Sequence, residues 1–171
     1  ESTPAQTART FVLSEAQQTL LFVNVGVEPV PSILRGFSAP VVLEFDYTDA
    51  QLLHLLAHDS DPFNRWEAGQ RLAMRCALAA LAQPFEDPVG AVLSPAFLDA
   101  MRGILRHPTL DAAFKELTLA LPSESYIAEQ LTVVDPQHVH AVRDSMRLQL
   151  ATSLAQDWQD TYTQNQNTGA Y

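Results

Sequence analysis

The chain has little cysteine and no long apolar run, and each shortage excludes a class of protein. Its single cysteine, Cys76, excludes an internal disulfide and a metal site built from several cysteines. We expect Cys76 to be a buried, inert thiol inside a helix, which agrees with a cytoplasmic location. No apolar run approaches the roughly 18 residues that a membrane-spanning helix needs, so we expect a soluble chain.

Positive charge is also scarce. Ten Lys and Arg residues stand against 20 Asp and Glu residues, which gives a formal net charge of −10. Such a field repels phosphate backbones and anionic lipids, and the basic residues form no run or aromatic-flanked patch. Nucleic acid and membrane surfaces are therefore not expected as partners.

Motifs for catalysis are missing as well. Ser32 and Ser38 lack the G-x-S-x-G pattern of a nucleophile elbow, and no glycine-rich loop precedes a helix. The acidic residues, Glu86 and Asp87 among them, are too dispersed to assign as a catalytic pair. We therefore assign no catalytic, cofactor-binding or metal-binding residue to this chain.

Two histidine pairs are candidates for metal ligands. His54 and His58 are spaced i, i+4 and share a helix face, but Leu55 stands where a zinc protease helix has its general-base Glu. No third ligand is marked, and a cation such as His58 suits the last turn of a helix. His138 and His140 are two residues apart and point about 200° apart on a helix. We favour a structural role for both pairs.

The segment 59–61, D-S-D, followed by Asn64, superficially suggests a calcium loop. It lacks the glycine and the distal glutamate of an EF-hand, and Pro62 begins a helix there. We interpret Asp61 as a helix cap. His107, which precedes a proline, is interpreted as a residue at a helix C-terminus.

The first 47 residues have a β-like pattern. Short runs at 9–13, 18–25, 33–35 and 41–46 are rich in Val, Leu and Phe and are bounded by turn-forming residues. A sandwich usually needs about seven strands, so four predict part of one whose partner strands lie elsewhere.

From Thr48 onward the pattern is helical. Thr48 and Gln51 fit a capping box, and Asp-Pro or Ser-Pro pairs mark further helix starts at Asp61, Ser94 and Asp135. After the first helix, which begins at Thr48, we expect helices over 61–82, 94–107, 111–121, 123–128 and 135–165. The fold class predicted is α+β, a short partial β-sandwich followed by an α-helical array.

Two helices have informative faces. On helix 61–82 we place Trp66 in the core rather than in an interface, and the row Glu67, Arg71 and Arg75 on the opposite, charged side. On the last helix an apolar residue recurs every four positions from 142 to 162 and drifts round the axis by about 40° per step. We expect Trp158 and Tyr162 to pack on helices beyond Tyr171.

Asn24 and the segment 29–41, P-V-P-S-I-L-R-G-F-S-A-P-V, carry a family resemblance. They resemble the junction region of bacterial aminopeptidase N, a family of zinc metallopeptidases of the gluzincin type. The likeness continues through the segment 63–68, F-N-R-W-E-A, to the helix after Asp135, and so covers nearly the whole chain.

The resemblance implies an architecture and a partition of roles. Residues 1–47 would be the end of a small β-sandwich domain, and residues 48–171 the first part of a C-terminal helical domain that walls the peptide cavity. The family's H-E-x-x-H zinc motif, its G-A-M-E-N motif and its catalytic tyrosine are absent here, so zinc would bind elsewhere in the parent enzyme. His54 and His58 lie after the sandwich and do not align with the zinc helix.

Three hypotheses remain at this point. The first is a non-catalytic segment of a cytoplasmic zinc aminopeptidase, whose partners are the remaining domains of the parent chain and, in the parent, peptide substrates. The segment was excised from that longer chain in this reading. The second is a stand-alone acidic helical module that binds a protein partner. The third, a small hydrolase that uses the histidine pair, has the least support in the sequence.

Overall fold

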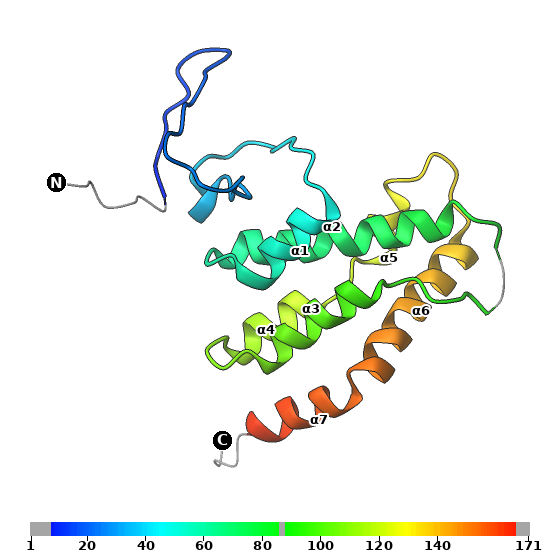
Figure 1. The fold of residues 1–171 in the computed structure, drawn as a ribbon. Coiled ribbons are helices and arrows are strands. Elements are labelled where there is room, and N and C mark those ends of the chain that lie inside the picture. The colour runs from blue at the N-terminus through cyan, green and yellow to red at the C-terminus, as the bar shows by residue number, and fades with distance from the viewer. Residues whose placement is uncertain (1–7, 86–87, 167–171) are drawn as a thin grey trace.

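The structure is a computed structural model that describes residues 8–85 and 88–166. Within these residues it is helical and contains no β-strand (Figure 1). The elements are η1 (Arg35–Phe37), α1 (Asp49–His58), α2 (Pro62–Leu81), α3 (Pro95–Arg106), α4 (Ala112–Leu119), α5 (Glu124–Ala128), α6 (Pro136–Ser153) and α7 (Ala155–Gln164). No helix in the described part of the chain combines the length and the apolarity that crossing a membrane requires.

All six predicted helix starts are confirmed by side-chain caps. Thr48 Oγ1 accepts the backbone N–H of Gln51, and the Gln51 side chain accepts the backbone N–H of Thr48. This reciprocal pair satisfies two backbone donors that a helix start leaves free. The side chains of five further cap residues also accept backbone N–H groups of the first turn: Asp61, Ser94, Asp111, Ser123 and Asp135.

The first two helical hairpins, α1–α2 and α3–α4, share one plan. In each, a buried cation four residues after the capping aspartate reaches back to the end of the preceding helix. Arg65 Nε donates to the carbonyl oxygen of Leu56 at 2.8 Å, and Lys115 Nζ donates to that of Leu105 at 2.8 Å. A cation satisfies the free carbonyl groups of a helix end and suits the negative end of its dipole.

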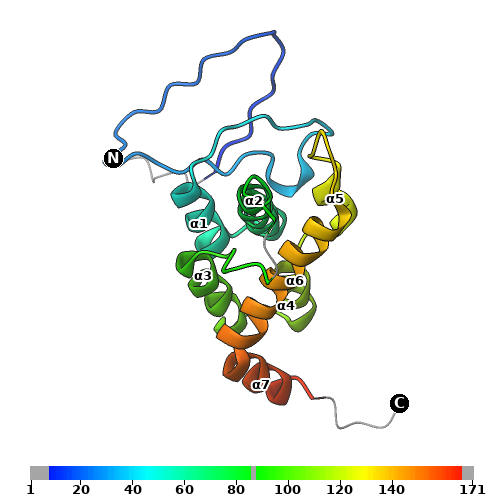
Figure 2. The same cartoon turned by 90° about the vertical axis from the view of Figure 1, so that its right-hand side faces the viewer.

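Helix α2 lies at the centre of the bundle and contacts α1, α4, α5 and α6 (Figure 2). Gly69 permits this close packing, because a Cβ atom there would lie 3.3 Å from Leu56 Cδ1. Ten of the largest fully buried side chains come from five of the helices, α1, α3, α4, α5 and α6: Leu52, Leu56, Phe97, Ile104, Leu105, Thr118, Ile127, Val139, Val142 and Met146. A single core therefore joins helices that are far apart in the sequence.

The prediction of one continuous helix over 135–165 was wrong. The helix breaks at Leu154, where φ is −114° and ψ is 18°. A straight helix would carry the drifting apolar row away from the core. The break keeps Leu154 fully buried and lets Asp157 Oδ1 meet Arg106 Nε on α3 at 2.5 Å. Figure 1 shows α7 (red-orange) turned from the axis of α6 (orange).

The predicted strands at 9–13, 18–25, 33–35 and 41–46 are not present in the described residues. Apart from the start of η1 at Arg35, the chain there is irregular, and many of its apolar side chains are exposed, as at Leu21 (84% exposed) and Val42 (91% exposed). A strand needs a neighbour to take its backbone hydrogen bonds, and no described segment pairs with these runs. The helical part of the predicted α+β fold is confirmed, whereas no β-sandwich is seen within residues 8–85 and 88–166.

Candidate functional site

The histidine pair of α1 does not form a metal site with other residues that the structure describes. His54 and His58 are exposed, with ring centroids 5.0 Å apart. In the described ranges, no three or more His, Cys, Asp or Glu side chains are placed to hold a metal ion. These residues therefore do not fit a zinc centre, and we derive no catalytic step from them.

The other candidate residues are dispersed over the fold. His138 is buried and its ring lies 4.9 Å from the Phe85 ring, whereas His140 is exposed with Nδ1 2.9 Å from Glu124 Oε1. His107 is the C-cap of α3. The structure brings none of these three together with the α1 pair.

Three further interpretations concern α2 and its surroundings. Cys76 is half-buried, and burial raises the pKa of its thiol, which agrees with an unreactive role. Trp66 is half-buried, with its ring centroid 5.6 Å from that of Phe63. Glu86 and Asp87 lie outside the described residues, and Ser38 makes no contact that suggests chemistry.

The most elaborate polar cluster joins the N-terminal segment to the turn between α1 and α2. Arg35 Nη1 lies 2.5 Å from Asp59 Oδ1, and its Nη2 donates to Ser60 Oγ at 2.7 Å. The backbone N–H of Gly36 donates to Asp61 Oδ2 at 2.8 Å. We call this cluster the Arg35 latch; its residues are Ser32, Arg35, Gly36, Asp59, Ser60, Asp61 and Asn64.

Ser32 and Asn64 close the latch on its other side. Asn64 Nδ2 lies 2.9 Å from both Ser32 Oγ and the carbonyl oxygen of Ile33. Ser32 Oγ also accepts from Arg35 Nη1 at 2.8 Å. The latch therefore binds both side chains and backbone groups of the segment 32–36. These bonds fix the position and the chain direction of that segment.

The backbone of the latch is unusual. Leu34, Gly36 and Phe37 have φ values of 58°, 61° and 53°, in the left-handed region that side chains other than glycine rarely adopt. Each non-glycine residue there costs about 1 kcal/mol or more. The conformation persists because the latch bonds fix the backbone on both sides and the Phe37 ring packs at 4.4 Å from the Phe63 ring.

Asp59 is the charged centre of the latch, and its side chain is only 2% exposed. Burial by itself raises the pKa of this carboxyl. Hydrogen bonding from Ser32, the backbone N–H of Asp61 and Arg35, with the charge of Arg35, outweighs burial and holds the pKa below its usual value. Asp59 therefore stays ionised at neutral pH and attracts Arg35 in a partly desolvated setting.

A second set of contacts fixes the chain where it enters α1. Arg71 Nη2 donates to the carbonyl oxygen of Phe45 at 2.7 Å, and Arg75 Nη2 donates to that of Tyr47 at 2.8 Å. The Tyr47 hydroxyl donates to the carbonyl oxygen of Pro31 at 2.8 Å. The prediction that Arg71 and Arg75 form a separate charged side of α2 missed this role, because carbonyl acceptors from a distant segment leave no mark in helical periodicity.

Sequence reasoning also missed the latch itself. Asp59 and Ser60 were considered only within the segment 59–61, which was compared with a calcium loop and interpreted as a helix cap, and Arg35 received no role. The sequence did contain one signal, the arginine in the otherwise apolar segment 29–41. A partly buried arginine such as Arg35 needs a carboxylate partner. The sequence does not say which of 20 acidic residues that partner is.

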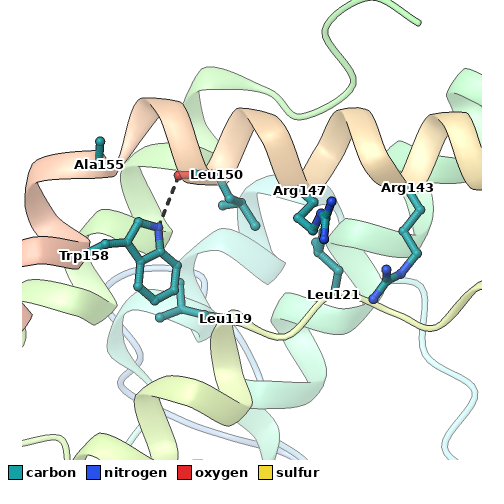
Figure 3. A pocket seen from close by; sticks show the side chains of 8 residues that line it. Leu119, Leu121, Arg143, Arg147, Leu150, Ala155 and Trp158 are labelled. Carbon is teal, nitrogen blue, oxygen red and sulfur yellow. Dashed lines mark hydrogen bonds between the residues drawn. The ribbon is translucent and has the colours of Figure 1, made fainter. Parts of the chain in front are cut away.

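A groove with a volume of about 560 Å³ lies between the end of α4, α6 and α7. Figure 3 shows its lining side chains, with Trp158 Nε1 donating to the carbonyl oxygen of Leu150 at 3.3 Å. We call it the Trp158 groove; it is lined by Leu119, Leu121, Arg143, Arg147, Leu150, Ala151, Ala155 and Trp158.

Comparisons with known proteins agree with the resemblance in the sequence. Residues 49–171 match the domain of unknown function DUF3458_C, described as ARM repeats, and residues 1–46 match DUF3458, described as an Ig-like fold. Among solved structures, the crystal structure of Legionella pneumophila aminopeptidase A in complex with aspartic acid is similar, with a TM-score of 0.70 and 26% identity. That match covers 88% of this chain and 17% of the other.

Curated relatives named aminopeptidase N are similar over most of the chain. The Escherichia coli protein is 35% identical over 90% of this chain, and the Caulobacter vibrioides protein is 41% identical over 84% of it. The chain spans only 18% and 16% of the lengths of these relatives. The predicted resemblance to aminopeptidase N is thus confirmed, and the chain belongs to the DUF3458_C family, whose ARM-repeat model matches residues 49–171.

Proposed function

We propose that this chain is a non-catalytic segment of a cytoplasmic, zinc-dependent aminopeptidase that removes N-terminal amino acids from peptides. The observation that carries the proposal is the similarity to aminopeptidase N over 84–90% of this chain and only 16–18% of the relatives. In such an enzyme zinc polarises the scissile carbonyl and activates water. The described residues do not fit the zinc ligands, so the rest of the polypeptide would supply them.

The segment has a structural task in this proposal. Residues 1–47 are part of a small β-sandwich, and residues 48–171 begin the helical domain that walls the peptide cavity. The Ig-like match over 1–46 supports this division, as do the exposed side chains of Leu21, Phe22 and Val23, which partner strands would cover. The Arg35 latch then sets how the sandwich sits on the helices.

The first experiment separates the segment from the enzyme. The purified 171-residue chain and the full-length protein are compared for zinc content by mass spectrometry and for hydrolysis of an aminoacyl p-nitroanilide. We expect zinc and activity in the full-length protein, lost on adding a chelator, and neither in the chain. Stoichiometric zinc in the chain together with chelator-sensitive hydrolysis would overturn the proposal.

A second experiment tests the structural task in the full-length enzyme. Asp59→Asn removes the latch charge, and Asp144→Asn is the matched control, because Asp144 makes only an exposed i, i+3 pair with Arg147. We expect Asp59→Asn to lower the melting temperature and to change KM for peptides, with zinc content unchanged. Equal behaviour of the two variants would show that the latch has no such role.

The stand-alone module remains the rival hypothesis, and self-association distinguishes the two. A segment with uncovered apolar residues binds a hydrophobic dye and scatters light as oligomers. A self-sufficient module is a monomer with little dye binding. The exposed residues between 12 and 27 favour the first outcome.

A further inference from the structure

The two histidines of α1 lie next to each other on the exposed side of the helix. His54 and His58 are one turn apart, and their ring centroids are 5.0 Å apart with the ring planes inclined at 51°. Both side chains are exposed, whereas the buried leucines of α1 face the core. Because residues at i and i+4 share one face of a helix, the backbone already brings the two imidazole rings together.

The separation of the rings is that of a chelate. A metal ion about 2.0 to 2.1 Å from one nitrogen of each ring, with about 90 to 110° between the two bonds, places the ring centroids about 4.5 to 5.2 Å apart. The observed 5.0 Å lies within this range. Both rings are free to make small rotations, because solvent surrounds them. One ion can therefore bind both rings without any change in the backbone.

Charge favours a cation at this place. His58 is in the last turn of α1, and the C-terminal end of a helix dipole is negative. The chain as a whole carries a net charge of −10, which also attracts cations. Buried Arg65, which donates to the carbonyl oxygens of Leu56 and Ala57, opposes this attraction in part. The ring nitrogens therefore supply most of the binding.

The number of nitrogens selects the kind of metal. Zinc sites in proteins have three or four protein ligands, and this pair supplies two. Copper(II) and nickel(II) accept tetragonal sets of nitrogen and oxygen ligands, in which water completes the coordination. Copper(II) binds nitrogen ligands most tightly among the divalent first-row ions. Leu55, in the position of a general-base glutamate, argues against catalysis by the pair but not against binding.

We propose that His54 and His58 form a two-nitrogen chelate site for a divalent copper or nickel ion, with water in the remaining positions. This inference is independent of the proposed function. The ion joins the last two turns of α1, and an ion that binds only the folded helix stabilises it. The backbone N–H of Asp59 ends α1 by donating to the carbonyl oxygen of Leu55 at 2.9 Å. Its hydrogen exchange should therefore slow when the ion binds.

Calorimetric titration of the metal-free 171-residue chain with Cu²⁺ and with Ni²⁺ tests the chelate. We expect one tight site, which His54→Ala and His58→Ala each weaken about tenfold or more. The double variant should bind no more than about twofold more weakly than either single variant, because a chelate is lost with either nitrogen. His140→Ala is the matched control, an exposed histidine paired with Glu124, and should leave the tight site unchanged.

A footprint on the unmutated protein needs no variant. Diethyl pyrocarbonate modifies accessible imidazole rings, and mass spectrometry of peptides locates the modification. Ni²⁺ should slow the modification of His54 and His58 at least fivefold and leave His140 reactive. The same ion should slow hydrogen exchange at the Asp59 amide at least threefold. The footprint is repeated in the full-length protein, where both rings should react without added metal and be protected with it.

Each other outcome overturns the inference. Binding that persists within twofold after loss of either histidine means that the tight site lies elsewhere. Protection of one ring alone means that no chelate forms, and equal protection of His140 means that the ion binds histidines without selection. Rings in the full-length protein that do not react before metal is added mean that another part of the polypeptide covers the pair.

Discussion

The segment 8–47 and the helical body 48–166 contain the same kinds of apolar residue but use them differently. Phe22 is 63% exposed, whereas Phe97 is 1% exposed. In the helical body, periodicity brings apolar residues of several helices to one core. In the N-terminal segment many of them are exposed, although Tyr47 and Phe45 reach that core, and the Arg35 latch adds polar contacts that fix the chain.

This difference teaches that the two regions depend on different forces. Burial stabilises the helical body, so its stability follows the apolar area removed from water. Directional hydrogen bonds and one partly buried ion pair hold the latch, so its stability follows geometry and charge. The predictions below separate these two contributions.

The largest effect is expected in the core. Phe97→Ala removes a fully buried ring and should lower the free energy of unfolding by about 3 to 5 kcal/mol. Phe22→Ala is the matched control in the exposed segment and should change it by less than about 0.5 kcal/mol. Urea denaturation followed by circular dichroism measures both. A large loss in Phe22→Ala would mean that the N-terminal segment has a core of its own.

The next effect concerns the latch. Asp59→Asn leaves Arg35 without its charged partner while it retains an oxygen for the backbone N–H of Asp61. The latch should open more easily by about 2 kcal/mol, because the hydrogen bond from Arg35 to this oxygen no longer has a charged acceptor. Amide exchange of Gly36, whose N–H is bonded to Asp61, should rise about 30-fold. Unchanged exchange at Gly36 would contradict the role given to Asp59.

The pH dependence of the latch follows from the same residue. The pKa of Asp59 is lowered in the folded chain, so its stabilisation is present above the unfolded value of about 3.9 and is lost as the pH falls through the folded value. Exchange at Gly36, corrected for its intrinsic pH dependence, should stay constant between about pH 5 and 8 and rise in acid. The Asp59→Asn variant should show a weaker acid response.

A smaller effect is expected when two helix-capping aspartates are compared. Asp61 and Asp111 both accept a first-turn N–H, at 3.0 and 2.9 Å, but only Asp61 also accepts the N–H of Gly36. Asp111→Ala should cost about 1 kcal/mol as a lost cap, and Asp61→Ala about 2 kcal/mol. Equal losses in urea denaturation would show that the Gly36 contact adds nothing.

The smallest contrast compares two glycines that have no neighbour within 4 Å of an added Cβ. Gly36 has φ +61°, so Gly36→Ala should destabilise the latch by about 1 kcal/mol through backbone strain. Gly103 lies inside α3, where alanine should stabilise the helix by about 0.5 to 1 kcal/mol. The same sign for both substitutions would contradict the left-handed conformation of Gly36.

The sequence predicted the helical body well because its signals are local. The capping box at Thr48 and the Asp-Pro start at Asp61 each depend on a few neighbouring residues, and both are confirmed. The break at Leu154 was not predicted, because the contacts that accompany it, the burial of Leu154 and the pair between Asp157 and Arg106, involve other helices. No sequence window of one helix contains that information.

The latch could not be predicted for the same reason. Arg35 and Asp59 are 24 residues apart, and which carboxylate meets Arg35 is decided by how the chain turns before α1. The strand runs at 18–25 and 41–46 were interpreted from local β propensity, but pairing is a property of neighbours. In the described residues those neighbours are missing, and the runs are irregular.

The central claim is that the latch holds the N-terminal segment and that strands elsewhere in a longer enzyme pair with it. One measurement tests this claim most directly. Hydrogen exchange is compared in the 171-residue chain and in the full-length protein. We predict that the segment 18–27 exchanges without protection in the chain and becomes protected in the full-length protein, while Gly36 is protected in both. Equal protection of 18–27 in the two proteins, or no protection of Gly36 in the chain, would contradict the account.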